Sequence, residues 1–126
     1  MHLEKDKIMK PIELVEHIRR EILIRNMDEY RDMLTNSDTI KVTDNYWKEV
    51  SALYQALDKQ NRDVLFKIIR QTLVDTIASV LSGLDGTFWF EGQEEDFELI
   101  YKGEKLNQHL GDLFLGLEED QNKNMQ

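Results

Sequence analysis

The sequence predicts a mainly α-helical bundle, built around one long central helix and completed by a small C-terminal β-hairpin. Three observations predict this fold class. The segment from Asp63 to Ser82 contains neither Gly nor Pro, so nothing in it forces a helix to end. Apolar residues recur there at helical spacing, and shorter helical patterns precede and follow it. Only after Gly86 does the pattern change to short runs with strand-like composition.

The first helix is expected to begin near Pro11, because proline is favoured in the first turn. Its apolar residues form two groups on faces about 100° apart: Leu14, Val15, Ile18 and Ile22, then Leu23, Met27, Tyr30 and Leu34. Either one helix wraps around its partner or the helix breaks near Asn26. Asn26 and Glu29 have the spacing of a capping box, which favours a kinked or interrupted helix.

A linker of low apolar content spans residues 35–43, and Thr43 or Asp44 is expected to cap the next helix. That helix is the richest in aromatic residues, and its spacing predicts core positions for Tyr46, Trp47, Val50, Leu53, Tyr54 and Leu57. Asp58 or Asn61 then begins the central helix after a tight corner. So short a link predicts that the two helices are antiparallel neighbours.

The central helix is expected over residues 62–84, with apolar side chains over an arc of roughly 180°. At 1.5 Å per residue it is about 35 Å long, against a radius of gyration of about 14 Å for a compact domain of this length. It should therefore cross the whole molecule. Small residues on its other face would let a second layer pack closely: Thr72, Ala78, Ser79 and Ser82. Gly83 and Gly86 mark its end.

The remaining sequence predicts short elements. The run Thr87 to Phe90 is strand-like, and residues 97–106 predict a hairpin that must dock on the helices. A last short helix or turn is expected over 110–117. We expect one domain over residues 1–126, with residues 1–10 and 118–126 flexible.

The charge of the chain is acidic and unevenly placed. The formal net charge is −9; residues 1–90 hold 15 acids and 13 bases, and residues 91–126 hold 10 acids and 3 bases. This balance repels phosphate backbones, so no nucleic-acid partner is expected. No apolar run is long enough to predict a membrane-spanning helix. The absence of Cys excludes disulfides and thiolate sites and fits a cytoplasmic location.

No reaction signature is present in the sequence. There is no Gly-x-Ser-x-Gly motif and no Gly-rich phosphate loop, and the three His residues lie in different segments. Glu13, His17 and Glu21 form one column on a helix, which we interpret as a solvated charged face and not as a metal site. We therefore expect no catalytic residue, no metal and no cofactor, and an enzyme is the less favoured class.

The favoured class is a small acidic protein-interaction or accessory module. In an extended run alternate side chains face opposite ways, so Trp89 is expected to be exposed between Phe88 and Phe90. The acidic stretch from residue 91 to 98 adjoins it. An aromatic anchor with an acidic rim would suit a basic protein partner. The candidate binding residues are Trp89, Phe90, Glu94 and Glu95. The competing and commoner case is that a loop or the hairpin covers such a residue, which would leave Trp89 buried.

A second hypothesis concerns Arg70, which falls inside the apolar arc of the central helix. A guanidinium there requires a carboxylate partner, or it must extend to the surface. The functional alternative is a polar pocket formed by Arg70, Gln71 and Asp75, as in a small-ligand-binding protein or an enzyme. A third option is a homodimer formed through an apolar helix face.

Several short sequence segments between residues 46 and 117 resemble a family of small bacterial proteins of unknown function. They are Tyr46-Trp47-Lys48, Leu65 to Gln71, Val74-Asp75-Thr76-Ile77, Leu84-Asp85-Gly86, Glu91-Gly92-Gln93 and Asp96-Phe97-Glu98-Leu99. The resemblance covers a little over half of the chain. It implies a small bacterial cytoplasmic protein and assigns no activity to any residue.

Overall fold

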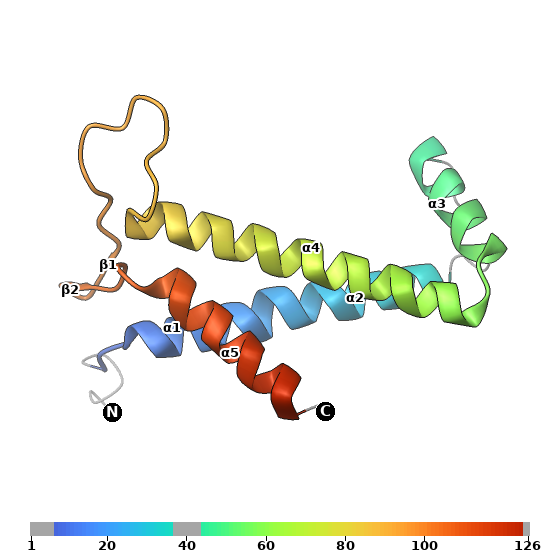
Figure 1. Cartoon of the computed structure of the whole chain (residues 1–126), viewed down its shortest axis with the longest axis horizontal. Helices are drawn as coiled ribbons and strands as arrows, with labels where there is room; N and C mark the ends of the chain where they lie inside the picture. The colour runs from blue at the N-terminus through green and yellow to red at the C-terminus, as the bar shows by residue number, and fades with distance from the viewer. Residues whose placement is uncertain (1–6, 37–43, 125–126) are drawn as a thin grey trace.

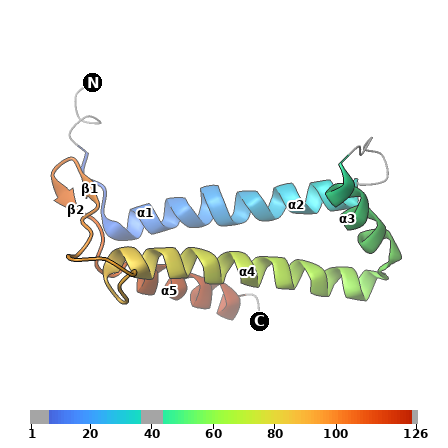
Figure 2. The ribbon, with the colours of Figure 1, turned by 90° about the horizontal axis from the view of Figure 1, so that it is seen from above.

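The computed structural model describes residues 7–36 and 44–124. Two long helical segments lie side by side, run in opposite directions and give the molecule an elongated shape (Figures 1 and 2). The first consists of α1 (Pro11–Ile18), a π-helix (Arg19–Ile24) and α2 (Arg25–Thr35), and the second is α4 (Lys59–Asp85). The predicted class is confirmed: the chain is mainly helical, is built around one long helix and carries a small hairpin.

The π-helix explains why the apolar residues of the first segment form two groups on different faces. Its wider turn holds an extra residue, which rotates the side chains after Ile24 relative to those before Arg19. Asn26 caps nothing: its Nδ2 donates to the carbonyl of Ile22 at 2.8 Å, within a helix that continues. The predicted interruption near Asn26 is therefore wrong, because the π-helix absorbs the change of face without ending the helix.

The caps of the next two helices lie where the sequence places them. Asp44 accepts from the Tyr46 N–H at 2.7 Å and starts α3 (Asn45–Ala56). Asp58 accepts from the Asn61 N–H at 2.8 Å and starts α4. Thr43, the other candidate cap, lies outside the described residues.

The position of α3 differs from the prediction. It does not lie along α4 but leans across the end of the long pair (Figures 1 and 2). Leu57 and Asp58, between the two helices, have extended backbone, which turns α3 away from the axis of α4. Tyr54 is buried and packs edge-on against Phe66, but Tyr46 and Leu53, expected in the core, are exposed.

The last helix, α5 (Leu110–Asn124), packs against both α4 and α1 (Figure 1). Its largest fully buried side chains are Leu110 and Phe114. A Cβ atom at Gly111 would lie 2.5 Å from the Ser82 Oγ, so α4 and α5 approach closely through small residues. The expected second layer is therefore present at Ser82 but not over Thr72 and Ser79, which are exposed.

The hairpin is short. Its strands are β1 (Ile100–Tyr101) and β2 (Glu104–Lys105), paired antiparallel. Lys102 and Gly103 form the turn between them, both at positive φ, as the favoured two-residue hairpin turn requires.

Two further expectations are corrected. Residues 87–90 form no strand, because the left-handed Gly86 directs them over the end of α4 instead of beside a partner strand. Helix α5 continues past residue 117 to Asn124, so the expected flexible C-terminal end is helical there. Residues 7–10 precede α1 without regular structure, and residues 1–6 are outside the described part. Within the described residues, no helix combines the length and the apolar character needed to span a membrane.

Candidate protein-interaction site

Residues 86–99 form a projecting loop between α4 and β1, which we name the acidic aromatic lobe (Figure 1). The lobe begins where α4 ends. Gly86 has a φ of 84°, the left-handed conformation that terminates a helix and that glycine adopts without steric cost. The chain leaves the helix there and returns fourteen residues later at β1.

A buried asparagine holds the returning part of the lobe against α4. The side-chain amide of Asn107, only 3% exposed, donates to the carbonyls of Leu84 at 2.6 Å and Phe97 at 2.7 Å. Its Oδ1 accepts from the Leu99 N–H at 2.7 Å. One side chain therefore satisfies three backbone groups that no regular structure pairs, and it fixes the base of the lobe.

The residue before Gly86 links the same corner to α5. The Asp85 carboxylate accepts from the backbone N–H groups of Gln108 and Gly111, each at 2.8 Å. These groups lie at the start of α5, where unpaired N–H donors and the helix dipole favour a negative charge. Asp85 at the end of one helix therefore caps the start of another.

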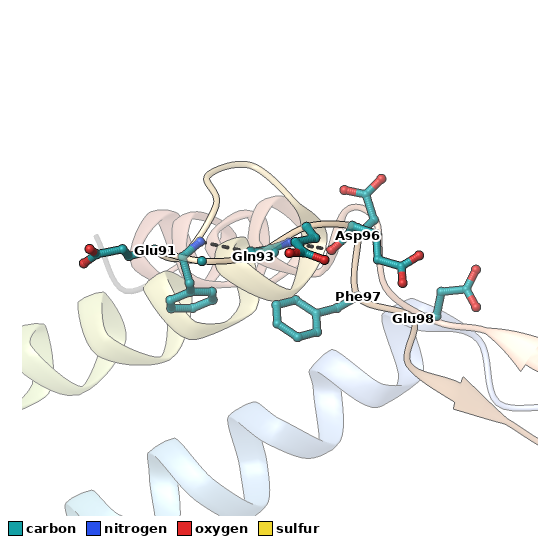
Figure 3. A pocket seen from close by; sticks show the side chains of 9 residues that line it. Glu91, Gln93, Asp96, Phe97 and Glu98 are labelled. Carbon is teal, nitrogen blue, oxygen red and sulfur yellow. Dashed lines mark hydrogen bonds between the residues drawn. The ribbon is translucent and has the colours of Figure 1, made fainter.

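A second brace lies inside the lobe itself. The backbone N–H of Phe90 donates to the Gln93 Oε1 at 2.9 Å, and the Gln93 N–H donates to the Phe90 carbonyl at 3.0 Å. The Gln93 Nε2 also donates to the Glu95 carbonyl at 3.0 Å, as the dashed lines in Figure 3 show. The turn between them uses Gly92 at a φ of 86°. The lobe is irregular but extensively hydrogen-bonded.

Aromatic rings form the side of the lobe that faces α4. The rings of Phe88 and Phe90 are 5.2 Å apart between centroids, and Phe97 lies 6.1 Å from Phe90. Gly83 provides the space for them, because a Cβ there would lie 2.7 Å from the Phe90 ring. Trp89 is 50% exposed, so the interpretation in which a loop or the hairpin covers it is wrong, but Phe88 and Phe90 are almost equally exposed at 44% and 49%. Alternation therefore does not single out Trp89.

Five carboxylates surround these rings, on residues 91, 94, 95, 96 and 98. All five residues are exposed, and within the described part of the chain none of them forms an ion pair. No Lys or Arg occurs between Gly86 and Tyr101. Residues 90–98 line an open hollow of about 870 Å³. In Figure 3 the carboxylates of Glu91 and Glu98 point outward, whereas the Phe97 ring points towards the helices; the Asp96 carboxylate lies beside Gly86.

The second predicted site is arranged differently. Arg70 Nη2 lies 2.7 Å from one oxygen of Glu118, and Arg19 Nε lies 2.7 Å from the other. The predicted structural ion pair of Arg70 is confirmed, with a second arginine on the same carboxylate. The Glu118 side chain is 7% exposed.

The three residues of the predicted polar pocket do not converge. Arg70 and Gln71 line a hollow of about 430 Å³ between α4 and α5. Asp75 lies outside this hollow and accepts from the Gln71 amide at 2.8 Å. Asp75 follows Arg70 by five positions, which places the two side chains about 140° apart around the helix.

The column on α1 forms a local contact. His17 Nδ1 lies 2.8 Å from a Glu21 carboxylate oxygen, and both side chains are exposed. Across residues 7–36 and 44–124, no three or more His, Asp or Glu side chains are grouped so as to hold a metal ion.

Comparison with family models, with curated proteins and with solved structures finds no match to this chain. The resemblance to small bacterial proteins of unknown function therefore stays a prediction. Two of the short sequence segments that carry this resemblance have clear roles in the structure. Leu84-Asp85-Gly86 forms the corner that caps α5 and opens the lobe, and Glu91-Gly92-Gln93 forms the turn that braces it.

Proposed function

We propose that this protein is an interaction module without catalytic activity that binds a basic segment of a partner protein through the acidic aromatic lobe. One observation supports this most directly. Five exposed carboxylates without ion-pair partners in the described chain surround half-exposed aromatic rings on a hydrogen-bonded backbone. The proposal places the protein and its partner in the cytoplasm, a location that fits a chain without Cys.

The chemistry of the lobe matches a partner that combines positive charge with apolar surface. A cluster of like charges raises the local concentration of an oppositely charged segment and speeds its association. Arg or Lys can also stack on exposed aromatic rings, a contact of about 0.5–1 kcal/mol at exposed sites. Tryptophan and tyrosine are enriched among the residues that dominate binding energy, which makes Trp89 the expected anchor.

The hydrogen bonds of Asn107 and Gln93 support the same proposal. A loop that is ordered before binding loses less conformational entropy when its partner arrives. The alternative function, a small-ligand protein or enzyme around Arg70, Gln71 and Asp75, has less support. Arg70 is already paired with Glu118, and Asp75 lies outside the hollow.

The proposal is tested by affinity capture from extract of the source cells with tagged wild-type protein. Two variants alter the lobe, Trp89→Ala and the pair Glu94→Gln with Glu95→Gln. Tyr46→Ala is the matched control, because Tyr46 is an equally exposed aromatic residue on α3, at the opposite end of the molecule.

The expected result is a basic protein retained by wild type and by Tyr46→Ala and lost with both lobe variants. Its retention should fall as salt is raised. A partner that Trp89→Ala retains would overturn the proposal. So would the absence of any protein enriched by wild type over the lobe variants.

A further inference from the structure

One face of α4 carries no charged residue over five turns. Gly83 marks this face, because it lies under the rings of Phe88 and Phe90. At about 100° per residue, every residue between Leu65 and Gly83 that falls within about 60° of Gly83 is uncharged: Leu65, Ile68, Ile69, Thr72, Thr76, Ser79 and Val80. We name these residues, with Gly83, the uncharged stripe. The charged residues of the same span lie outside it: Lys67, Arg70 and Asp75.

Five of the eight stripe residues are exposed, whereas Gly83 lies under the lobe rings and Leu65 and Ile69 are partly buried against the core. Ile68 is 58% exposed and Val80 is 56% exposed, although both are large aliphatic residues. Thr72, Thr76 and Ser79 are also exposed. Helix α5 covers another side of α4, at Ser82, and the lobe and α3 rise at the two ends (Figure 1).

The pattern of the stripe is self-complementary. When two copies of α4 lie antiparallel about a two-fold axis at the level of Val74, each stripe position faces another stripe position. Near the centre line Thr72 faces Thr76 and Leu65 faces Gly83. Because the two-fold axis keeps each flank of the stripe on its own side, Ile68 faces Ser79 and Ile69 faces Val80. Large residues thus face small ones or each other, and the two small threonines lie nearest the axis. Leu65 also meets the Phe88 and Phe90 rings that cover Gly83.

From this pattern we infer that the protein forms a homodimer in which α4 packs antiparallel against α4 of a second copy. A two-fold interface requires a surface that is complementary to itself, and the stripe satisfies this condition. The net charge of the chain also favours a second copy as the molecule that covers the stripe. Each copy has a net charge of −9, and the stripe is a face through which two copies can approach without bringing like charges together.

The surface area of the chain is consistent with a second copy. The chain exposes 9610 Å², whereas a compact monomer of its mass exposes about 7,000 Å². The elongated shape and the projecting lobe account for part of this difference of about 2,500 Å², which is larger than the roughly 800 Å² that each partner contributes to a stable interface. The dimer uses the stripe and the rings of Phe88 and Phe90, whereas the proposed function depends on Trp89 and the lobe carboxylates, so variants of Thr72 or Thr76 and variants of Trp89 test the two separately.

The test measures molar mass by light scattering behind gel filtration for wild type, Thr72→Lys and Thr76→Glu. The two threonines are exposed, so either substitution leaves the fold of the single chain intact, which circular dichroism checks. Wild type is expected at twice 15.0 kDa. Each single variant places an unpaired charge beside the axis and should weaken the dimer about tenfold or more. Gln71→Lys, outside the stripe, is the matched control and should remain dimeric.

The decisive step is to mix the two single variants. In the inferred register, position 72 of one copy faces position 76 of the other, so the two introduced charges attract and the mixture should regain a mass of twice 15.0 kDa. Wild type at the mass of one chain, at two concentrations about a hundredfold apart, would overturn the inference. So would a dimer that both single variants retain, or a mixture that stays monomeric.

Discussion

Two groups of carboxylates in this molecule differ in burial and in ion pairing. Glu118 of α5 lies between Arg19 of the π-helix and Arg70 of α4, with its side chain 7% exposed and one arginine on each oxygen. The five acids of the acidic aromatic lobe are exposed and have no ion-pair partner within the described chain. A buried charge needs a partner within the fold, because isolated burial is very costly. A solvated charge needs none, so an accumulation of solvated charges is available to bind another molecule.

The contrast between buried and solvated carboxylates predicts that the largest change in the free energy of unfolding follows from substitution of Glu118. Glu118→Ala leaves two guanidinium groups without their common partner and should lower the free energy of unfolding by about 3 kcal/mol. Urea unfolding followed by circular dichroism measures this change. A joint replacement by apolar residues, Arg19→Met with Arg70→Met and Glu118→Leu, should recover most of the loss. A loss below about 1 kcal/mol for Glu118→Ala would show that the ion pairs are solvated and that burial does not distinguish the two groups.

A smaller effect is expected at the residue that holds the lobe. Asn107→Ala removes one donor amide and one acceptor from three backbone groups, which should cost about 2 kcal/mol. The effect on the local opening of the lobe should be larger than the effect on the global free energy of unfolding. Hydrogen exchange at the Leu99 amide should accelerate strongly, while exchange in the centre of α4 changes only with global stability. Unchanged exchange at Leu99 would mean that the lobe is not held by Asn107.

The cap of α5 should contribute less again. Asp85→Ala leaves the N–H groups of Gln108 and Gly111 without an acceptor and should cost about 1 kcal/mol. Asp85→Asn keeps one oxygen but removes the charge at the helix start, so it should cost about half as much. Thermal unfolding of the two variants, compared side by side, separates the hydrogen bonds from the charge. Equal costs would assign the whole effect to the charge.

The smallest effect is expected within the lobe. Glu94→Gln together with Glu95→Gln should change the free energy of unfolding by less than about 0.5 kcal/mol. Neither carboxylate has an ion-pair partner to lose within the described chain. The double variant therefore measures the loss of solvated charges, whereas Glu118→Ala measures the loss of a buried, paired charge. A destabilisation as large as that of Glu118→Ala would show that the lobe acids serve the fold.

The elements of the fold could largely be predicted from sequence, because each depended on local chemistry. Caps at Asp44 and Asp58, the proline at the start of α1 and the left-handed Gly86 each act within a few residues. The orientation of α3 could not be predicted, because it depends on the extended backbone at Leu57 and Asp58. In the sequence, the only sign of the π-helix is that the apolar residues move from one face of the helix to another. A kink would produce the same pattern.

The site residues divide in the same way. The clustering of acids beside Trp89 follows from composition and could be predicted, whereas alternation did not predict that Phe88 and Phe90 are as exposed as Trp89. The Arg70 pair could be predicted, but its partner Glu118 lies 48 residues away and was expected in a flexible end. Its spacing of four from Phe114, itself four from Leu110, was the available signal. No local pattern marks Asn107, whose three partners meet only in the folded chain.

The central claim is that the acidic aromatic lobe binds a basic, partly apolar segment of another protein. Selection from a display library of random peptides tests it even while the natural partner is unidentified. Wild-type protein should enrich peptides that combine Arg or Lys with at least one large apolar residue, and Trp89→Ala should enrich none of them. Enrichment of neutral or acidic peptides, or an equal selection by Trp89→Ala, would contradict the claim.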